Sequence, residues 1–140
     1  MIKYSSEKPP NWVTLVKAMP IVSTLWDQNL IITYGDTYHS RIETTPDLIA
    51  HESVHVEQQR LVGGPENWWS KWLSDTNFRL MQELEAYRAQ LAFLRNDLMS
   101  VPRQERKYKM GKYYKWVAET LSGEIYGGIV SYQQAMNMIQ

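Results

Sequence analysis

Residues 45–64 read TPDLIAHESVHVEQQRLVGG, a stretch with the start, the length and the end of an α-helix. Thr45 offers an N-cap hydroxyl, Pro46 suits the first helical position, and Asp47 places an acid in the first turn. The glycine pair at the end has the conformational freedom with which helices commonly stop. We therefore predict one helix that runs to about Val62.

Two histidines lie four residues apart in this predicted helix, at His51 and His55. At about 100° per residue they share one face, roughly 40° apart, so both imidazoles can bind one metal ion. Glu52 follows His51 and can accept a proton from a metal-activated water without being a ligand itself. This pattern is typical of metallopeptidases. The alternative is that both histidines are ordinary surface or partly buried helix residues.

A hydrolytic zinc site needs three protein ligands and an open position for water. His39 is the only other histidine and the chain has no cysteine, so a carboxylate is the expected third ligand. Glu83 and Glu85 lie in a second predicted helix, from about Thr76 to Met99. The apolar stripe of that helix runs through Leu80, Leu84, Tyr87 and Leu91.

Glu83 lies about 60° from the centre of this stripe, on the inward side, whereas Glu85 is some 200° away from Glu83 and should face solvent. A carboxylate on an apolar face is costly unless it is paired or bound to metal. We therefore expect Glu83 to be the third ligand. The alternative is a boundary residue that pairs with a nearby Arg or Lys.

The segment His51-Glu52-Ser53-Val54-His55 followed by Glu83-Leu84-Glu85-Ala86-Tyr87 resembles the gluzincin type of zinc peptidase. The resemblance covers about Thr33 to Leu91 and extends to compact members, including small peptidase-like proteins of phage genomes. It implies Zn²⁺ as cofactor and Glu83 as the ligand from the second helix. One departure is Tyr87, because many gluzincins have an aspartate there that orients a metal-binding histidine.

The expected reaction is metal-assisted hydrolysis of a peptide bond, with Glu52 as general base. The developing oxyanion needs a further donor, for which Tyr87, Tyr126 and His39 are candidates. Tyr87 is more simply explained as a core residue. Gln58 or Gln59 could support a ligand from behind, although an exposed glutamine is the default interpretation.

The expected substrate is a peptide or protein in extended form, added to the edge of a small sheet beside the active helix, as is common in this class. Residues Leu30 to Arg41 predict that sheet as a hairpin, with its turn at Gly35-Asp36. Three tryptophans could form a wall of the cleft, although at helical spacing such residues are more often core: Trp68, Trp69 and Trp72.

The remaining pattern predicts an α+β, mostly helical, compact zincin-like domain over residues 1–140, with residues 1–10 as an extended arm. Further helices are expected over Asn11–Ala18, ended by Pro20, and over Arg103–Leu121, begun after Pro102. Pro65–Leu73 could be a short helix or a structured loop. Glycines at 123, 127 and 128 mark a loop, and Ser131 with Gln134 forms a capping box for a last helix.

Fifteen basic and fifteen acidic residues balance, so the net charge gives no reason to expect nucleic acid or an anionic membrane as partner. No apolar run approaches a membrane span, and the N-terminus lacks a signal-peptide core. The absence of cysteine fits a reducing, cytoplasmic compartment. The oligomeric state is not indicated.

Two other functions compete with a peptidase. One is a hydrolase of a related amide, such as a peptidoglycan cross-link. The other is a zinc-stabilised module that binds a partner without catalysis. Glu52 argues against the second, because structural zinc sites need no general base and are usually closed by four protein ligands.

Overall fold

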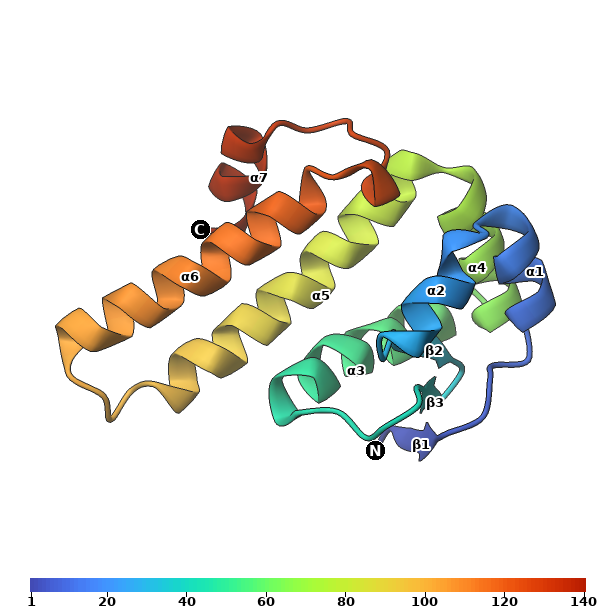
Figure 1. Ribbon diagram of the computed structural model, residues 1–140, viewed down its shortest axis with the longest axis horizontal. Helices are drawn as coiled ribbons and strands as arrows, with labels where there is room; N and C mark the ends of the chain where they lie inside the picture. Colours follow the sequence, from blue (N-terminus) through green and yellow to red (C-terminus); the bar gives the residue numbers. More distant parts are fainter.

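Helices dominate the chain, as predicted, and the fold is α+β. The computed structural model describes residues 1–140 (Figure 1). In chain order its elements are β1 (Lys3–Ser5), α1 (Trp12–Ala18), α2 (Ile21–Asp27), β2 (Ile32–Tyr34), β3 (Thr37–His39), α3 (Pro46–Leu61), α4 (Pro65–Ser74), α5 (Thr76–Asp97), α6 (Arg103–Leu121), the 3₁₀ turn η1 (Glu124–Tyr126) and α7 (Tyr132–Ile139).

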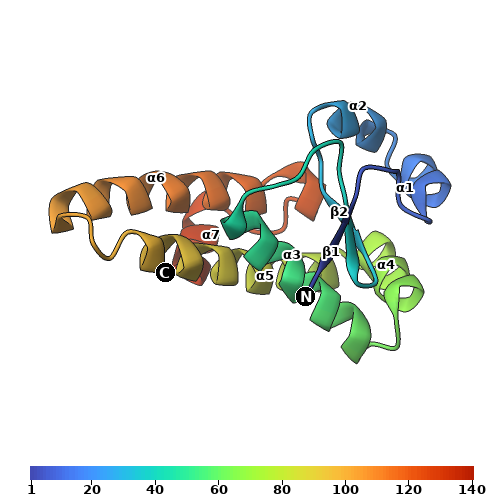
Figure 2. The ribbon, with the colours of Figure 1, turned by 90° about the horizontal axis from the view of Figure 1, so that it is seen from below.

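The long helix α5 is the centre of the arrangement, since it packs against α3, α4, α6 and α7. Helices α5 and α6 form a long antiparallel pair that extends to one side of the molecule (Figure 1). Figure 2 shows the sheet, α1, α2 and α4 gathered at the opposite end. Helix α3 lies along α5 on the side away from α6, which places the two predicted ligand-bearing helices next to each other.

The buried apolar side chains form two clusters. The main core consists of fourteen buried residues from α4 to α7. A smaller core of four residues joins α1 and α2 to the sheet: Leu15, Val22, Trp26 and Ile32. Met19, Trp69 and Leu73 are partly buried and pack against both clusters, so they connect the N-terminal helices to the rest of the fold.

The sheet has the order β1-β3-β2. The predicted hairpin of β2 and β3 is confirmed, with Thr33 opposite Tyr38 in antiparallel register. Gly35, at the hairpin turn, has a φ of +65°, which a glycine adopts without strain. The N-terminal arm is extended, as predicted, but it also contributes β1, which pairs in parallel with β3 and was not predicted from the sequence.

Most of the helix predictions agree with the structure. Helix α1 ends at Ala18, before Pro20, as predicted, but a further helix, α2, follows Pro20 and was not predicted. Of the two alternatives for Pro65–Leu73, the structure has the helix, which runs to Ser74, and the glycine loop contains η1. The predicted N-cap hydroxyl of Thr45 is wrong, because this hydroxyl donates to Asp47 Oδ1 at 2.6 Å and caps no backbone N–H.

Two helix boundaries predicted from the sequence, the end of α3 and the start of α7, are formed as expected. Gly63 and Gly64 follow α3 with φ values of +91° and +118°. The capping box of Ser131 and Gln134 is present at the start of α7. None of the helices has both the length and the apolar character that crossing a membrane requires.

Two glycines offer a matched test of the fold. Gly127 has a φ of +85°, and a Cβ there would lie 2.9 Å from Thr76 Cβ, so we expect Gly127→Ala to destabilise the protein by about 1–3 kcal/mol. Gly111 lies in α6, where a Cβ meets no atom within 4 Å, so Gly111→Ala should stabilise by about 1 kcal/mol. Urea unfolding of both variants measures the difference, and shifts of the same sign would contradict the described environments.

Candidate metal centre

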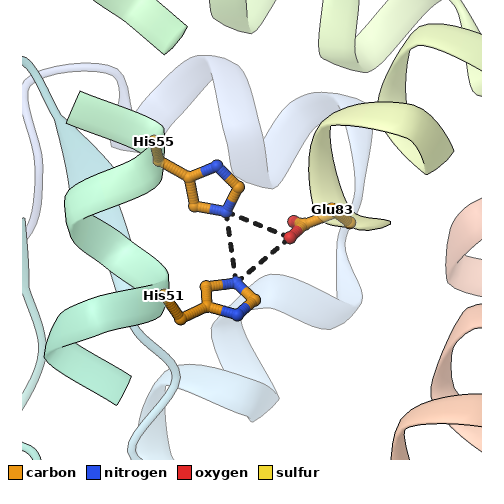
Figure 3. A group of neighbouring side chains, drawn as sticks. All are labelled: His51, His55 and Glu83. Atoms are coloured by element: carbon orange, nitrogen blue, oxygen red, sulfur yellow. Dashed lines mark hydrogen bonds and ion pairs between the residues drawn. The ribbon is translucent and has the colours of Figure 1, made fainter. Parts of the chain in front are cut away.

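Three side chains converge between α3 and α5 (Figure 3). His51 Nε2 and His55 Nε2 lie 3.2 Å apart, and Glu83 Oε2 lies 3.2 Å from the first and 3.0 Å from the second. All three residues are buried, with at most 7% of their surface exposed. The group could hold a metal ion, as the sequence predicted.

Helix geometry accounts for this convergence. The spacing of four residues places His51 and His55 on the same face of α3, with their rings 4.9 Å apart between centroids. The contact between α3 and α5 turns that face toward Glu83. Glu85, two residues later on α5, is exposed, so the inward position of Glu83 and the outward position of Glu85, predicted from the apolar stripe, are confirmed.

A glutamine fixes the tautomer of His51. Gln90 Nε2 donates to Asp47 Oδ2 at 2.8 Å, so the amide presents its oxygen to His51 Nδ1, 3.1 Å away. Because this oxygen can only accept, Nδ1 must carry the proton. The other ring nitrogen, Nε2, is then left with a lone pair directed at Glu83.

A second glutamine acts on His55 in the same way. Gln58 Nε2 donates to the backbone carbonyl of Gln82 at 3.0 Å, and its Oε1 lies 2.8 Å from His55 Nδ1. His55 therefore also carries its proton on Nδ1 and directs the Nε2 lone pair into the group. Gln58 is buried, so the default expectation of an exposed glutamine is wrong, while its expected place behind a ligand agrees with this contact.

When both rings are neutral, two imidazole lone pairs and a carboxylate oxygen thus meet with no hydrogen-bond donor among them. Such a group repels itself unless a cation or a proton lies among its atoms. Around a tetrahedral ion with ligands at about 2.0–2.1 Å, neighbouring ligand atoms are about 3.3 Å apart. The observed 3.0–3.2 Å is close to that spacing.

The pKa values of His55 and Glu83 show that the group stabilises a positive charge. Burial disfavours the imidazolium of His55, but the carboxylate of Glu83 outweighs burial and raises the pKa of His55 to about 9. Burial likewise favours a protonated Glu83, but His55 outweighs it and holds the pKa of Glu83 well below its usual range. Without a metal ion, the cluster therefore retains a proton in neutral solution.

Glu52 lies beside the three residues but is not one of them. It is buried, and Thr33 Oγ1 of β2 donates to its Oε2 at 2.7 Å. Its other oxygen makes no hydrogen bond within the protein. Glu52, His51, His55 and Glu83 line one cavity of about 320 Å³. A carboxylate in this position can take a proton from a molecule held in the cavity.

Two tyrosines named from the sequence also line this cavity, Tyr87 and Tyr126. Tyr87 belongs to the main core, and its ring meets that of His51 with centroids 4.5 Å apart. Burial, followed by the charge of Glu83, raises the pKa of both hydroxyls, so both stay protonated and able to donate. His39 does not line the cavity, since its Nδ1 lies 3.0 Å from the carbonyl oxygen of Glu7.

The three tryptophans of α4 serve both as core and as cavity wall. Trp68 and Trp72 are buried in the main core, and Trp69 packs against it. All three line the cavity, and the Trp68 ring lies 5.1 Å from that of His55 between centroids.

Gln59 connects α3 to the sheet and does not contact the ligands. Its Nε2 donates to the Thr33 carbonyl at 2.8 Å, and its Oε1 accepts from Gly35 N at 2.7 Å. Trp69 Nε1 donates to the same carbonyl at 3.0 Å. Gln59 is 1% exposed, so the default expectation of an exposed side chain is wrong here too.

Gln90, which contacts His51, was not predicted from the sequence as part of the site. It follows Glu83 by seven residues, which is nearly two helical turns, so it lies on the same face of α5. The sequence therefore contained the signal for Gln90, whereas its partner Asp47 was recognised only as a helix-start residue. Thr33, which holds Glu52, had no signal in the local sequence.

Comparison with models of protein families, with curated proteins and with solved structures gives no match to this chain.

Substitution of Glu83 by glutamine tests the metal centre. We expect Glu83→Gln to weaken Zn²⁺ binding by at least about 100-fold, because it removes the only charged ligand. The matched control is Glu85→Gln on the exposed face of the same helix, which should bind as the wild type does. Titration against a chelating dye measures both affinities, and full occupancy of Glu83→Gln at micromolar zinc would remove Glu83 from the site.

The glutamine contacts predict a separate effect. Gln90→Ala removes the acceptor for His51 Nδ1 and should weaken metal binding about 10- to 100-fold. Gln104→Ala, on the exposed surface of α6, is the control. NMR of the imidazole nitrogens in the metal-free protein should also show His51 shifting from one tautomer to a mixture. An unchanged affinity and an unchanged spectrum would contradict the assigned role.

Proposed function

We propose that this protein is a zinc-dependent metallopeptidase of the gluzincin type, with His51, His55 and Glu83 as ligands and Glu52 as general base. The observation that carries the proposal is the buried convergence of three lone-pair atoms in a cavity that also contains Glu52. A buried group of this kind is costly unless a cation or a proton lies among its atoms, and a zinc ion would supply that charge.

Zinc is favoured by the donor set and the spacing of its atoms. Two imidazole nitrogens and one carboxylate oxygen are a set found in hydrolytic zinc enzymes, and three protein ligands leave a position open. When bound, Zn²⁺ would supply Lewis-acid activation of a water and of the substrate carbonyl. The tautomers set by Gln58 and Gln90 hold both imidazoles ready to bind it.

Glu52 acts in this mechanism through its unbonded oxygen. Thr33 holds Oε2, so the carboxylate cannot turn away from the cavity. The free Oε1 takes a proton from the attacking water, and the same carboxyl then delivers that proton to the leaving amine nitrogen. A zinc site with only a structural role has no use for such a group, which supports catalysis over a non-catalytic binding module.

The developing negative charge on the substrate oxygen needs a donor, and Tyr87 and Tyr126 are the candidates. Both residues line the cavity, and burial, followed by the charge of Glu83, raises the pKa of both hydroxyls, so both keep a proton in neutral solution. His39 is a weaker candidate, because its ring contacts the N-terminal segment outside the cavity.

The edge of β2 is only partly available to an extended substrate. Because the hairpin turn has two residues, Thr33 and Tyr38 form a non-hydrogen-bonded pair. The carbonyl of each residue therefore points away from the other strand. The outward carbonyl of Thr33 already accepts from Gln59 and Trp69. A peptide would therefore pair with the segment that precedes Thr33.

Exchange of Glu52 tests the mechanism. Glu52→Gln keeps the size and the contact with Thr33 but cannot take a proton, so kcat/KM on a casein-derived peptide should fall about 10²- to 10⁴-fold. Zinc content should remain at the wild-type level. Glu57→Gln, an exposed position on the same helix, is the matched control and should retain activity.

Two outcomes of this experiment would count against the proposal. Equal activity of Glu52→Gln and wild type would exclude Glu52 as the general base. Cleavage of peptidoglycan with no cleavage of any peptide would favour the related amide hydrolase instead.

A further inference from the structure

The charges of this protein balance over the whole chain but not along it. Residues 103–115, in the first part of α6, contain six basic residues and one acidic residue. Because the chain has fifteen of each kind, the remaining residues comprise nine basic and fourteen acidic ones. The balanced net charge, which gave no reason to expect a polyanionic partner, therefore conceals one strongly basic segment.

The exposed face of α6 carries part of this charge as a stripe. Met110 and Val117 are buried in the main core, on the side of the helix away from the stripe. Helix α6 belongs to the arm that extends away from the sheet (Figure 1). Six residues at three- and four-residue intervals line one open hollow on this face, here called the basic stripe: Gln104, Lys107, Tyr108, Gly111, Lys112 and Lys115.

The three lysines of the basic stripe have no acidic partner. The only ion pair within α6 joins Lys109 to Glu105, beside the stripe. Glu119 follows Lys115 by one turn, at the end of the stripe, and forms no ion pair with it. A helix face that is merely solvated typically alternates its charges, with acids and bases paired four residues apart. Like charges without such partners create a field that attracts a polyanion.

Tyr108 and Gly111 give the basic stripe more than charge. Tyr108 is 65% exposed, and Lys112 Nζ lies 4.6 Å from the centroid of its ring. Glycine within a helix lowers stability relative to alanine, yet a Cβ at Gly111 would meet no atom within 4 Å. Packing inside the protein therefore gives no reason for this glycine. Its effect is to leave a hollow beside an exposed aromatic ring.

We propose that the basic stripe binds single-stranded nucleic acid, with its lysines on the phosphates and a base stacked on Tyr108. A basic groove with exposed aromatic rings is how proteins hold single strands without sequence preference. From Gln104 to Lys115 the stripe is about 17 Å long, which is the length of about five stacked nucleotides. The surface is separate from the metal centre, and its proposed role does not rest on the proposed function.

Two other polyanions match the basic stripe less well. An anionic membrane is bound most stably when apolar side chains enter it, and the stripe presents no aliphatic side chain. An acidic polypeptide offers charges to the lysines but no base to stack on Tyr108.

The test measures binding of a fluorescent oligothymidylate of about 12 nucleotides to the full chain by anisotropy. With three lysines on phosphates, the logarithm of the affinity should fall with the logarithm of the salt concentration at a slope of about −2. The affinity should therefore drop about 20-fold between roughly 50 and 200 mM salt.

A triple variant locates the charge contribution: Lys107→Gln, Lys112→Gln and Lys115→Gln. It should bind at least about 10-fold more weakly at low salt, with a slope near zero. The matched control makes the same change in net charge at exposed lysines elsewhere: Lys8→Gln, Lys17→Gln and Lys71→Gln. The control should bind as the wild type does, and urea unfolding should show that both triple variants fold.

Tyr108→Ala separates stacking from charge. It should weaken binding about 5- to 100-fold and leave the salt slope unchanged, because the lysines remain. Tyr132→Ala, at an exposed tyrosine of α7, is the control and should not change the affinity.

Four results would overturn the inference. The first is no binding of the oligonucleotide at low salt, and the second is an equal loss in both triple variants. The third is polyglutamate bound as tightly as the oligonucleotide, which would show recognition of charge alone. The fourth is binding to vesicles of phosphatidylserine and phosphatidylcholine without binding to the oligonucleotide, which would assign the basic stripe to a membrane surface.

Discussion

The contact between α3 and α5 is the interaction on which the rest of the structure depends. It brings two imidazole nitrogens and one carboxylate oxygen within 3.0–3.2 Å of one another in a buried position. Polar links between the same two helices lie on both sides of this group, from Gln90 to Asp47 and from Gln58 to the backbone of Gln82. The two helices are thus joined by a network that makes structural sense when a positive charge lies at its centre.

The sheet serves this centre through one residue, Thr33. Its hydroxyl holds Glu52, and its carbonyl accepts from Gln59 of α3 and Trp69 of α4. The position of Glu52 is therefore set from outside its own helix. The short strands contribute little apolar burial, and their importance lies in where they place this side chain. Because the N-terminal helices share a small core with β2, the part of the cavity that these helices line is fixed to the same frame.

Local patterns predicted the parts of the site that a single helix determines. The bounds of α3 and the inward position of Glu83 follow from caps, breakers and the spacing of apolar residues, and all agree with the structure. The pairing of β1 with β3, the bond from Gln58 to the backbone of Gln82 and the contacts of Thr33 depend on segments distant in sequence, so local patterns could not reveal them. The hydroxyl of Thr45 shows a different limit. Two neighbouring groups could bond it, and it donates to the Asp47 carboxylate instead of capping a backbone N–H of the helix.

The glutamines behind the two histidines have a consequence for charge balance. An amide orients an imidazole as a carboxylate does, but it adds no charge. With a divalent cation bound, the cavity would contain two positive charges and the two negative charges of Glu83 and Glu52, and so would be electrically neutral. An aspartate at position 87 would add a third negative charge among side chains that are all buried. Tyr87 in that position, with Gln90 one turn further on, keeps the buried centre neutral while both rings remain oriented.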